Sequence, residues 1–305
     1  MTVPSIGIGV PVWQGAAFVG ETLECLLAQR GVAVTLFVSI DGPDAESERA
    51  CRAFATDPRV RLVVQPQRLG WVRNAAAVFA GAAAFGAPFV CLHPHDDLAS
   101  PDYLATLAAV AAERPEVAVV YSDIAAFGDW DATIAQPSVE GTPLMRQLTL
   151  LTQHFNAVAY RGLTRASALA QVPPLNGNVC DDFACDTVWM ARLARAGELV
   201  RVPLALYRKR FHSASAHVQW WQWEASAKIE AWLQHCLDML AEALPVCADD
   251  AERGRVAAAA RARLVERSEI GPFATEVWQL GEAERHLLQQ RFDRICAERF
   301  ALRAG

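Results

Sequence analysis

Residues 89–97 read Phe-Val-Cys-Leu-His-Pro-His-Asp-Asp, a short apolar run followed by imidazoles and two adjacent carboxylates. The apolar run has the length of a buried strand, so the polar residues stand where that strand ends. Open α/β sheets bind ligands at the carboxyl ends of their strands. Carboxylates suit Mg2+ or Mn2+, and an ion with few protein ligands keeps positions free for substrate phosphates. The segment predicts a metal-diphosphate site; the alternative is that Asp96 and Asp97 only form a turn.

Short apolar runs alternate with helical patterns around this segment. We expect strands at 5–12, 34–40, 60–64, 89–92 and 117–121, and helices near 17–29, 45–55 and 72–85 and from Pro101 onward, the last capped by Ser100. This alternation predicts βαβ units, and therefore an α/β, Rossmann-like fold with a mostly parallel sheet flanked by helices.

The rhythm breaks after residue 121. A loop-rich stretch near 127–143 and a strand-like segment at 156–160 precede a helix near 186–196 and a strand at 199–207, which we expect to complete the same sheet. From residue 218 the pattern is helical and rich in tryptophan. These tryptophans are expected to pack on the rest of the protein, to pair subunits as a homo-oligomer, or to lie at a lipid interface.

Composition limits the classes of partner. The 305 residues are 53% hydrophobic, which is ample for a packed core, and the net charge of -6 gives no basic field for nucleic acid. The eight cysteines form no CxxC pair and are expected to be reduced thiols. No apolar run reaches the length of a membrane span. We therefore expect a soluble cytoplasmic protein, and a peripheral contact with the inner face of the membrane stays open.

Two other expected strand or helix ends carry polar side chains. Asp41 follows the second strand and is suited to accept a hydrogen bond from an imide N–H such as that of uracil, or to form an Asx turn with Gly42. Arg73 stands at the start of a helix, where its guanidinium could bind a phosphate or a base edge, or simply be exposed.

Several segments together resemble the inverting family 2 glycosyltransferases, which have the GT-A fold. That family's Pro-Val-Tyr-Asn-like motif is similar to Pro-Val-Trp-Gln at 11–14, and its Glu-x-Leu-x-x-Leu-Leu-x-Gln helix matches residues 21–29. Its Asp-Asp-Gly-Ser is similar to Ile-Asp-Gly-Pro at 40–43, and its Gly-x-x-x-Ala-Arg-Asn to the shorter Gly-Trp-Val-Arg-Asn at 70–74. Its Asp-x-Asp-like metal motif is similar to His-Asp-Asp at 95–97.

The resemblance continues to about residue 216. A family Glu-Asp motif that opens a helix is similar to Cys185-Asp186. The family pattern Tyr-Arg-x-His-x-x-Ser-x-Ser, whose loop covers the donor diphosphate, is similar to Tyr-Arg-Lys-Arg-Phe-His-Ser-Ala-Ser at 207–215, in which His212 is the nearest matching histidine. The resemblance implies a nucleotide-sugar-binding half at 1–123, an acceptor-side half at 124–217 and a helical C-terminal extension at 218–305.

The resemblance also implies a reaction: metal-dependent transfer of a sugar, with inversion, from a nucleotide-sugar, foremost a UDP-sugar, to a saccharide or other hydroxyl acceptor in cell-surface polysaccharide synthesis. Asp97 is expected to hold Mn2+ or Mg2+, with His95 and His212 as further contacts. Asp186 takes the role of general base, or Asp182 if the loop is built differently. The expected nucleotide contacts are Pro11, Trp13, Glu21, Asp41, Arg73 and Asp96, the last facing the ribose or the metal; Trp13 stacks near the base or packs in the core.

Two departures from the family pattern keep rival functions open. Ile40 replaces the first acid of the nucleotide motif, and Cys185 replaces the glutamate before the base. They are compatible with a catalytically silent GT-A domain that serves as an interaction or assembly module. A nucleotide-sugar hydrolase, which would share the donor site and lack an acceptor pocket, is the third possibility.

Overall fold

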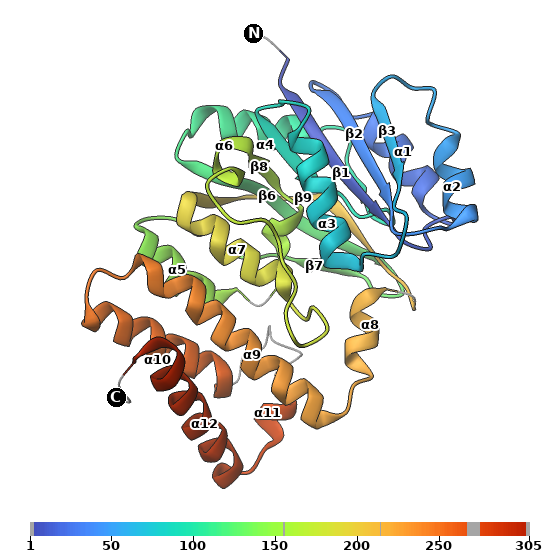
Figure 1. Cartoon of the computed structure of the whole chain (residues 1–305). Coiled ribbons are helices and arrows are strands. Elements are labelled where there is room, and N and C mark those ends of the chain that lie inside the picture. Colours follow the sequence, from blue (N-terminus) through green and yellow to red (C-terminus); the bar gives the residue numbers. More distant parts are fainter. Residues whose placement is uncertain (1–2, 155, 214, 267–274, 303–305) are drawn as a thin grey trace. The chain divides into compact units, whose positions relative to one another are not determined.

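The computed structural model describes residues 3–154, 156–213, 215–266 and 275–302. The chain divides into two compact units whose segments alternate along the sequence (Figure 1). The sheet unit comprises Met1–Ser138, Val158–Gly177 and Leu199–His212, and the helical unit comprises Val139–Ala157, Asn178–Glu198 and Ser213–Gly305.

Within the described residues, nine strands form one sheet in the order β3-β2-β1-β4-β8-β6-β9-β5, with β7 paired to β6 outside this path. Strands β1 to β4 pair in parallel, and the pairs β4–β8, β6–β8, β5–β9 and β6–β7 are antiparallel. The predicted α/β fold with a mixed sheet is thus confirmed. The strands are β1 (Ser5–Val12), β2 (Ala33–Ile40), β3 (Val60–Val64), β4 (Phe89–Leu92), β5 (Leu98–Ala99), β6 (Val117–Gly128), β7 (Ala132–Ile134), β8 (Leu163–Arg165) and β9 (Glu198–Phe211).

The sheet unit also contains helical segments, and the first three of them each follow one of the parallel strands β1 to β3. These segments are α1 (Val19–Leu27), α2 (Ala45–Arg52), α3 (Trp71–Ala83), α4 (Tyr103–Glu113), the 3-10 turn η1 (Val158–Arg161) and α6 (Ala166–Leu169). The backbone of α3 approaches β1 closely, because a Cβ on Gly9 would lie 2.8 Å from the Val78 carbonyl oxygen and one on Gly7 would lie closer still to that of Ala82. The glycines of β1 therefore let a small-residue helix pack directly on the sheet.

Two local expectations were wrong, and one helix was not predicted. Residues 158–161 form η1 and not a strand, and α4 begins at Tyr103, because Pro101 lies in a turn in which the Tyr103 N–H donates to the Ser100 carbonyl (3.0 Å). The loop-rich stretch near 127–143 contains β7 and is followed by α5 (Pro143–Gln153). That helix had a readable signal, since the Thr142 side chain caps it and proline occupies its first position.

The helical unit contains the predicted helical C-terminal extension. Besides α5 it holds α7 (Cys185–Ala196), α8 (Ala216–Trp221), α9 (Ala225–Ala243), η2 (Leu244–Val246), α10 (Asp250–Val265), α11 (Thr275–Gln279) and α12 (Glu282–Phe300). Trp232 is buried, and Trp220 and Trp223 contact the buried Phe183, whereas Trp221 is 49% exposed. Most of these tryptophans thus serve packing within this unit. None of the helices in the described ranges is both long and apolar enough to cross a bilayer.

A buried cation connects three helices of this unit. The Arg263 guanidinium donates to the Leu150 and Leu151 carbonyls in the last turn of α5, at 3.3 and 3.0 Å, and lies 3.0 Å from Nε2 of the buried His235. Burial, reinforced by the charge of Arg263, lowers the pKa of His235 well below its ordinary value. The imidazole is therefore neutral in the folded protein and can accept a hydrogen bond from Arg263.

This burial predicts acid sensitivity. The unfolded state takes up a proton at His235 near pH 6.5 and the folded state only far below it, so the free energy of unfolding should fall as the pH drops below about 6.5, by up to about 1.4 kcal/mol per pH unit for this group. Urea unfolding from pH 7.5 to 4.5 should show a shallower decline in His235→Gln than in the wild type. His286→Gln, at an exposed position of α12, should retain the wild-type slope. Equal slopes in all three proteins would contradict this assignment.

Candidate active site

The turn that follows β4 carries Asp96 and Asp97. The Asp97 N–H donates to the Pro94 carbonyl (3.2 Å), which closes the turn. The Thr22 hydroxyl on α1 contacts the carbonyls of His95 (2.8 Å) and Asp97 (3.0 Å). The turn is therefore held between the end of β4 and the first helix, at the carboxyl edge of the parallel strands, as the sequence predicted.

The Asp97 carboxylate lies inside the protein and is 2% exposed. It accepts hydrogen bonds from the Tyr207 hydroxyl (2.7 Å), the Arg210 backbone N–H (2.9 Å) and Nε of Arg161 (3.3 Å). Burial and the charge of Asp96 raise its pKa, while Arg161 opposes them. Both carboxylate oxygens are occupied by donors from β9 and η1, so Asp97 joins these segments to the turn.

Asp96 has a different environment. Its Oδ2 lies 3.0 Å from Nε2 of His212, and the two side chains are 17% and 21% exposed. Burial would raise the pKa of Asp96, but the hydrogen bond with His212 and the charges of His95 and His212 outweigh it and lower the pKa. The Phe18 ring lies 4.9 Å from the imidazole and covers it. The structure thus brings together two of the predicted site residues, which are far apart in the sequence.

A carboxylate and an imidazole in contact are a suitable donor pair for Mn2+ or Mg2+. Within the described ranges, no group of three or more His, Cys, Asp or Glu side chains could hold a metal. An ion held by the Asp96–His212 pair would therefore need its other ligands from outside these side chains, such as phosphate oxygens and water.

The two remaining histidines of this segment have structural contacts. Nδ1 of His95 lies 3.2 Å from the Pro11 carbonyl at the end of β1, and a Cβ on Gly15 would collide with the His95 ring. His93 is fully buried beside Tyr207, and burial lowers its pKa to about 4. His95 thus connects the predicted metal turn to the predicted nucleotide motif at Pro11, and His93 is a neutral core residue.

Three of the predicted nucleotide residues, Pro11, Trp13 and Asp41, lie at the ends of β1 and β2, while Glu21 lies in α1, Arg73 in α3 and Asp96 in the turn after β4. The carboxylate of the buried Asp41 accepts from the backbone N–H groups of Leu69 (2.5 Å) and Gly70 (3.1 Å), while the Gly42 N–H donates to the Ile40 carbonyl. Asp41 therefore shapes the loop before α3 instead of forming an Asx turn with Gly42.

The same loop brings an arginine onto the predicted base-stacking residue. The Arg68 guanidinium lies 4.1 Å from the centroid of the Trp13 ring. Trp13 is partly exposed, and Arg73, at the start of α3, is exposed. A tryptophan face, an arginine and the loop fixed by Asp41 thus share one edge of the sheet unit.

The predicted base lies in the helical unit, at the start of α7. Its loop is strained, because Asp181, Asp182 and Ala184 all have positive φ angles, of 49°, 59° and 53°. Asp182 accepts from the Asn178 N–H (3.1 Å), and Asp186 accepts from the Thr187 N–H (2.8 Å). Strained backbone of this kind gathers at functional sites, and Asp186 is the carboxylate that the helix itself carries.

Several residues of the site had no clear signal in the sequence. Tyr207 and Arg210 belong to a motif that was recognised, yet the pattern does not show that both contact the Asp96-Asp97 turn. Phe18, Arg161 and Phe127, whose ring centroid lies 4.5 Å from the Arg210 guanidinium, had no signal at all. Their roles depend on contacts between residues that are distant in the sequence.

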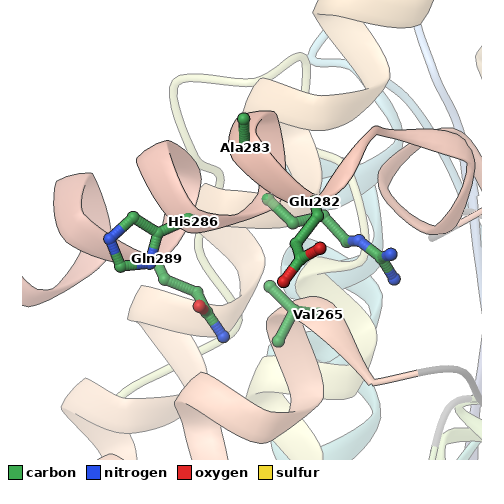
Figure 2. Close-up of a pocket in the computed structure, with 6 residues that line it drawn as sticks. Val265, Glu282, Ala283, His286 and Gln289 are labelled. Carbon is green, nitrogen blue, oxygen red and sulfur yellow. The ribbon is translucent and has the colours of Figure 1, made fainter.

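The helical unit also contains a cavity of about 700 Å3 (Figure 2). Its described lining is Val265 of α10 with Glu282, Ala283, Arg285, His286 and Gln289 of α12. Glu282 is the one carboxylate among these residues, and none of them belongs to a motif with a predicted role. The candidate catalytic residues are therefore those around Asp96 and Asp186, and not those of the cavity.

The sheet order, with the acidic turn after β4 at the carboxyl edge of the parallel strands, is that of the GT-A fold class. The glycosyl transferase family 2 model matches residues 8–170, more than half of the chain. The chain belongs to glycosyl transferase family 2.

Solved structures support the fold. S. aureus TarS 1-349 in complex with UDP-GlcNAc has a TM-score of 0.69 and 14% identity, over 98% of this chain and 84% of that chain. Mannosyltransferase PcManGT from Pyrobaculum calidifontis, in complex with GDP-Man and Mn2+, has a TM-score of 0.54 and 16% identity, over 98% of this chain and 88% of that one.

A relative in sequence is the uncharacterized protein y4gI of Sinorhizobium fredii, 31% identical over 125 residues. That match covers 39% of this chain and 13% of the relative. The chain thus matches a small part of a much longer protein.

The buried Asp97 carboxylate predicts that the fold of the site depends on it. In Asp97→Asn the side-chain amide N–H points at one of the three groups that donate to Asp97, so one hydrogen bond is lost. The free energy of unfolding should fall by about 2 kcal/mol. Asp96→Asn, on the same turn, should lose about 1 kcal/mol or less, since Asp96 is more exposed. Urea unfolding at pH 7.5 measures both, and equal stabilities of the two variants would refute the structural role of Asp97.

Proposed function

We propose that this protein transfers a sugar from a nucleotide-sugar to a hydroxyl acceptor, with inversion at the anomeric carbon. The observation that carries the proposal is the Asp96–His212 pair, 3.0 Å apart at the carboxyl edge of the sheet of a family 2 chain. A packing role explains this pair poorly, because both side chains are partly exposed and polar.

The proposed metal ligands are Asp96 and His212. Asp97 was the expected ligand by sequence, but its oxygens accept three hydrogen bonds and it is 2% exposed, so Asp96 is the carboxylate better placed for an ion. His95 stays in the proposal as a neighbour that orients the turn through Pro11. A bound divalent ion supplies charge that neutralises the departing diphosphate.

The nucleotide is proposed to bind along the ends of β1 and β2. Trp13 offers a ring for stacking, and Arg68 offers cationic donors beside it. Arg73 is an exposed cation at the start of α3. Asp41 acts here by fixing the Leu69–Gly70 backbone. UDP is the first candidate, because the similar TarS structure contains UDP-GlcNAc, and GDP is the second, because PcManGT contains GDP-Man.

Asp186 is proposed as the general base that takes the proton of the acceptor hydroxyl as it attacks. A carboxylate can fill this role, and Asp186 lies in the first turn of α7, after a loop with positive φ angles. Asp182 is the alternative. The acceptor is proposed to be a saccharide, in cell-surface polysaccharide synthesis, and peripheral membrane contact and pairing through the C-terminal helices stay predictions.

Donor binding tests the proposal most directly. Calorimetric titration of UDP, GDP and dTDP, each with and without Mn2+, should show metal-dependent binding of one nucleotide. Asp96→Ala and His212→Ala should abolish the metal dependence, because each removes one of two ligands. Asp102→Ala, at an exposed position of the sheet unit, should bind like the wild type. A folded wild-type protein that binds none of the three nucleotides would contradict the donor site and favour the silent-domain alternative.

The assignment of Asp186 as the base predicts that Asp186→Asn and Asp182→Asn differ in their rates of sugar transfer. Asp186→Asn should slow sugar transfer by about 100-fold to 10,000-fold while leaving the Kd for the nucleotide unchanged, because the base acts only on the acceptor. Asp182→Asn should retain most of the rate. The reverse pattern would assign the base to Asp182. Release of free sugar at equal rates with and without any acceptor would identify a hydrolase instead.

A further inference from the structure

Arg210 lies beside the Asp96–His212 pair, near the C-terminal end of strand β9. Nε of Arg210 donates to the backbone carbonyl of Asp96 (3.0 Å), and the His212 ring contacts the carboxylate of the same residue (3.0 Å). His212 directly follows β9, two positions after Arg210, and both side chains contact Asp96. The guanidinium is thus adjacent to the proposed metal and diphosphate position.

Two aromatic rings hold the guanidinium in place. Its central carbon lies 4.8 Å from the centroid of Phe18 and 4.5 Å from that of Phe127. Phe18 also covers the His212 ring. Cation–π contacts with two rings restrict the movement of the guanidinium before any ligand arrives.

The side-chain partner of this guanidinium is an exposed carboxylate. Nη2 of Arg210 lies 2.6 Å from Oε2 of Glu21, whose side chain is 58% exposed, while the Arg210 side chain is 18% exposed. An ion pair that is open to solvent on one side contributes little free energy and exchanges readily. A guanidinium also has more N–H donors than its bonds to Glu21 and Asp96 use.

We propose that Arg210 binds the diphosphate of the donor and that Glu21 occupies the same N–H groups until the donor arrives. This inference rests on the proposed function and adds a residue to it. A phosphate oxygen replaces the Glu21 carboxylate on Nη2, so charge neutralisation is shared between the ion at Asp96–His212 and the guanidinium.

The proposed exchange predicts that substitutions of Arg210 and of Glu21 change the Kd for the nucleoside diphosphate in opposite directions. Arg210→Met should raise the Kd for the nucleoside diphosphate by about 10-fold to 100-fold, as expected for a lost charge-assisted hydrogen bond. Glu21→Gln should lower that Kd, because the competing carboxylate is gone. If Glu21 instead contacts the nucleotide itself, as the family resemblance implies, Glu21→Gln raises the Kd.

The experiment is calorimetric titration of the full chain with UDP and GDP, and with UMP and GMP as probes that lack the second phosphate, at constant Mn2+. Lys209→Met is the matched control, since it removes a positive charge one residue away, where Lys209 packs on the Phe211 ring. Arg210→Lys keeps the charge and loses the planar fork, and should bind with an intermediate Kd. Glu21→Gln changes an exposed side chain and therefore tests the inference even if Arg210→Met folds poorly.

Weaker diphosphate binding in Arg210→Met, with little change for the monophosphate and for Lys209→Met, together with tighter binding in Glu21→Gln, supports the inference. Diphosphate binding by Arg210→Met within twofold of the wild type, or weaker binding in Glu21→Gln, overturns it and leaves the proposed function intact. Failure of the wild type to bind any of the nucleotides overturns the proposed function and this inference together.

Discussion

The candidate site is built around the buried carboxylate of Asp97. Its oxygens accept from Tyr207 and Arg210 on β9 and from Arg161 on η1, and its own backbone belongs to the turn after β4. A buried carboxylate is costly unless its lone pairs are satisfied, so these donors are confined to positions around it. The carboxylate thereby determines where the end of β9 lies relative to the turn.

The placement of β9 decides the functional geometry. Because the Arg210 backbone is bonded to Asp97, the Arg210 side chain reaches the Asp96 carbonyl and the His212 ring reaches the Asp96 carboxylate. Phe18, from the segment before α1, then covers His212 and one face of the guanidinium. A structural carboxylate and a candidate ligand-binding carboxylate thus stand side by side, and the first positions the partners of the second.

Local patterns predicted the elements that local physics controls. The apolar runs of β1 and β4 and the helical spacing of α1 and α3 appear in the structure close to their expected bounds. The error at 158–161 arises because apolar residues in a short turn are buried by tertiary packing and resemble a strand in sequence. The error at α4 arises because Pro101 lies in a turn that precedes the helix. The start of α5 was readable from Thr142-Pro143 and was overlooked.

The amino-acid sequence by itself determined the α/β class, the acidic turn after β4 and the order of the family 2 motifs, because strand and helix periodicities are local properties. It could not distinguish Asp96 from Asp97, which are neighbours with the same chemistry. The tertiary structure separates them: one carboxylate is buried under Tyr207, and the other meets a histidine 116 positions away. Burial and long-range contacts decide which of two equal side chains is available to a ligand, and neither is a local property of the chain.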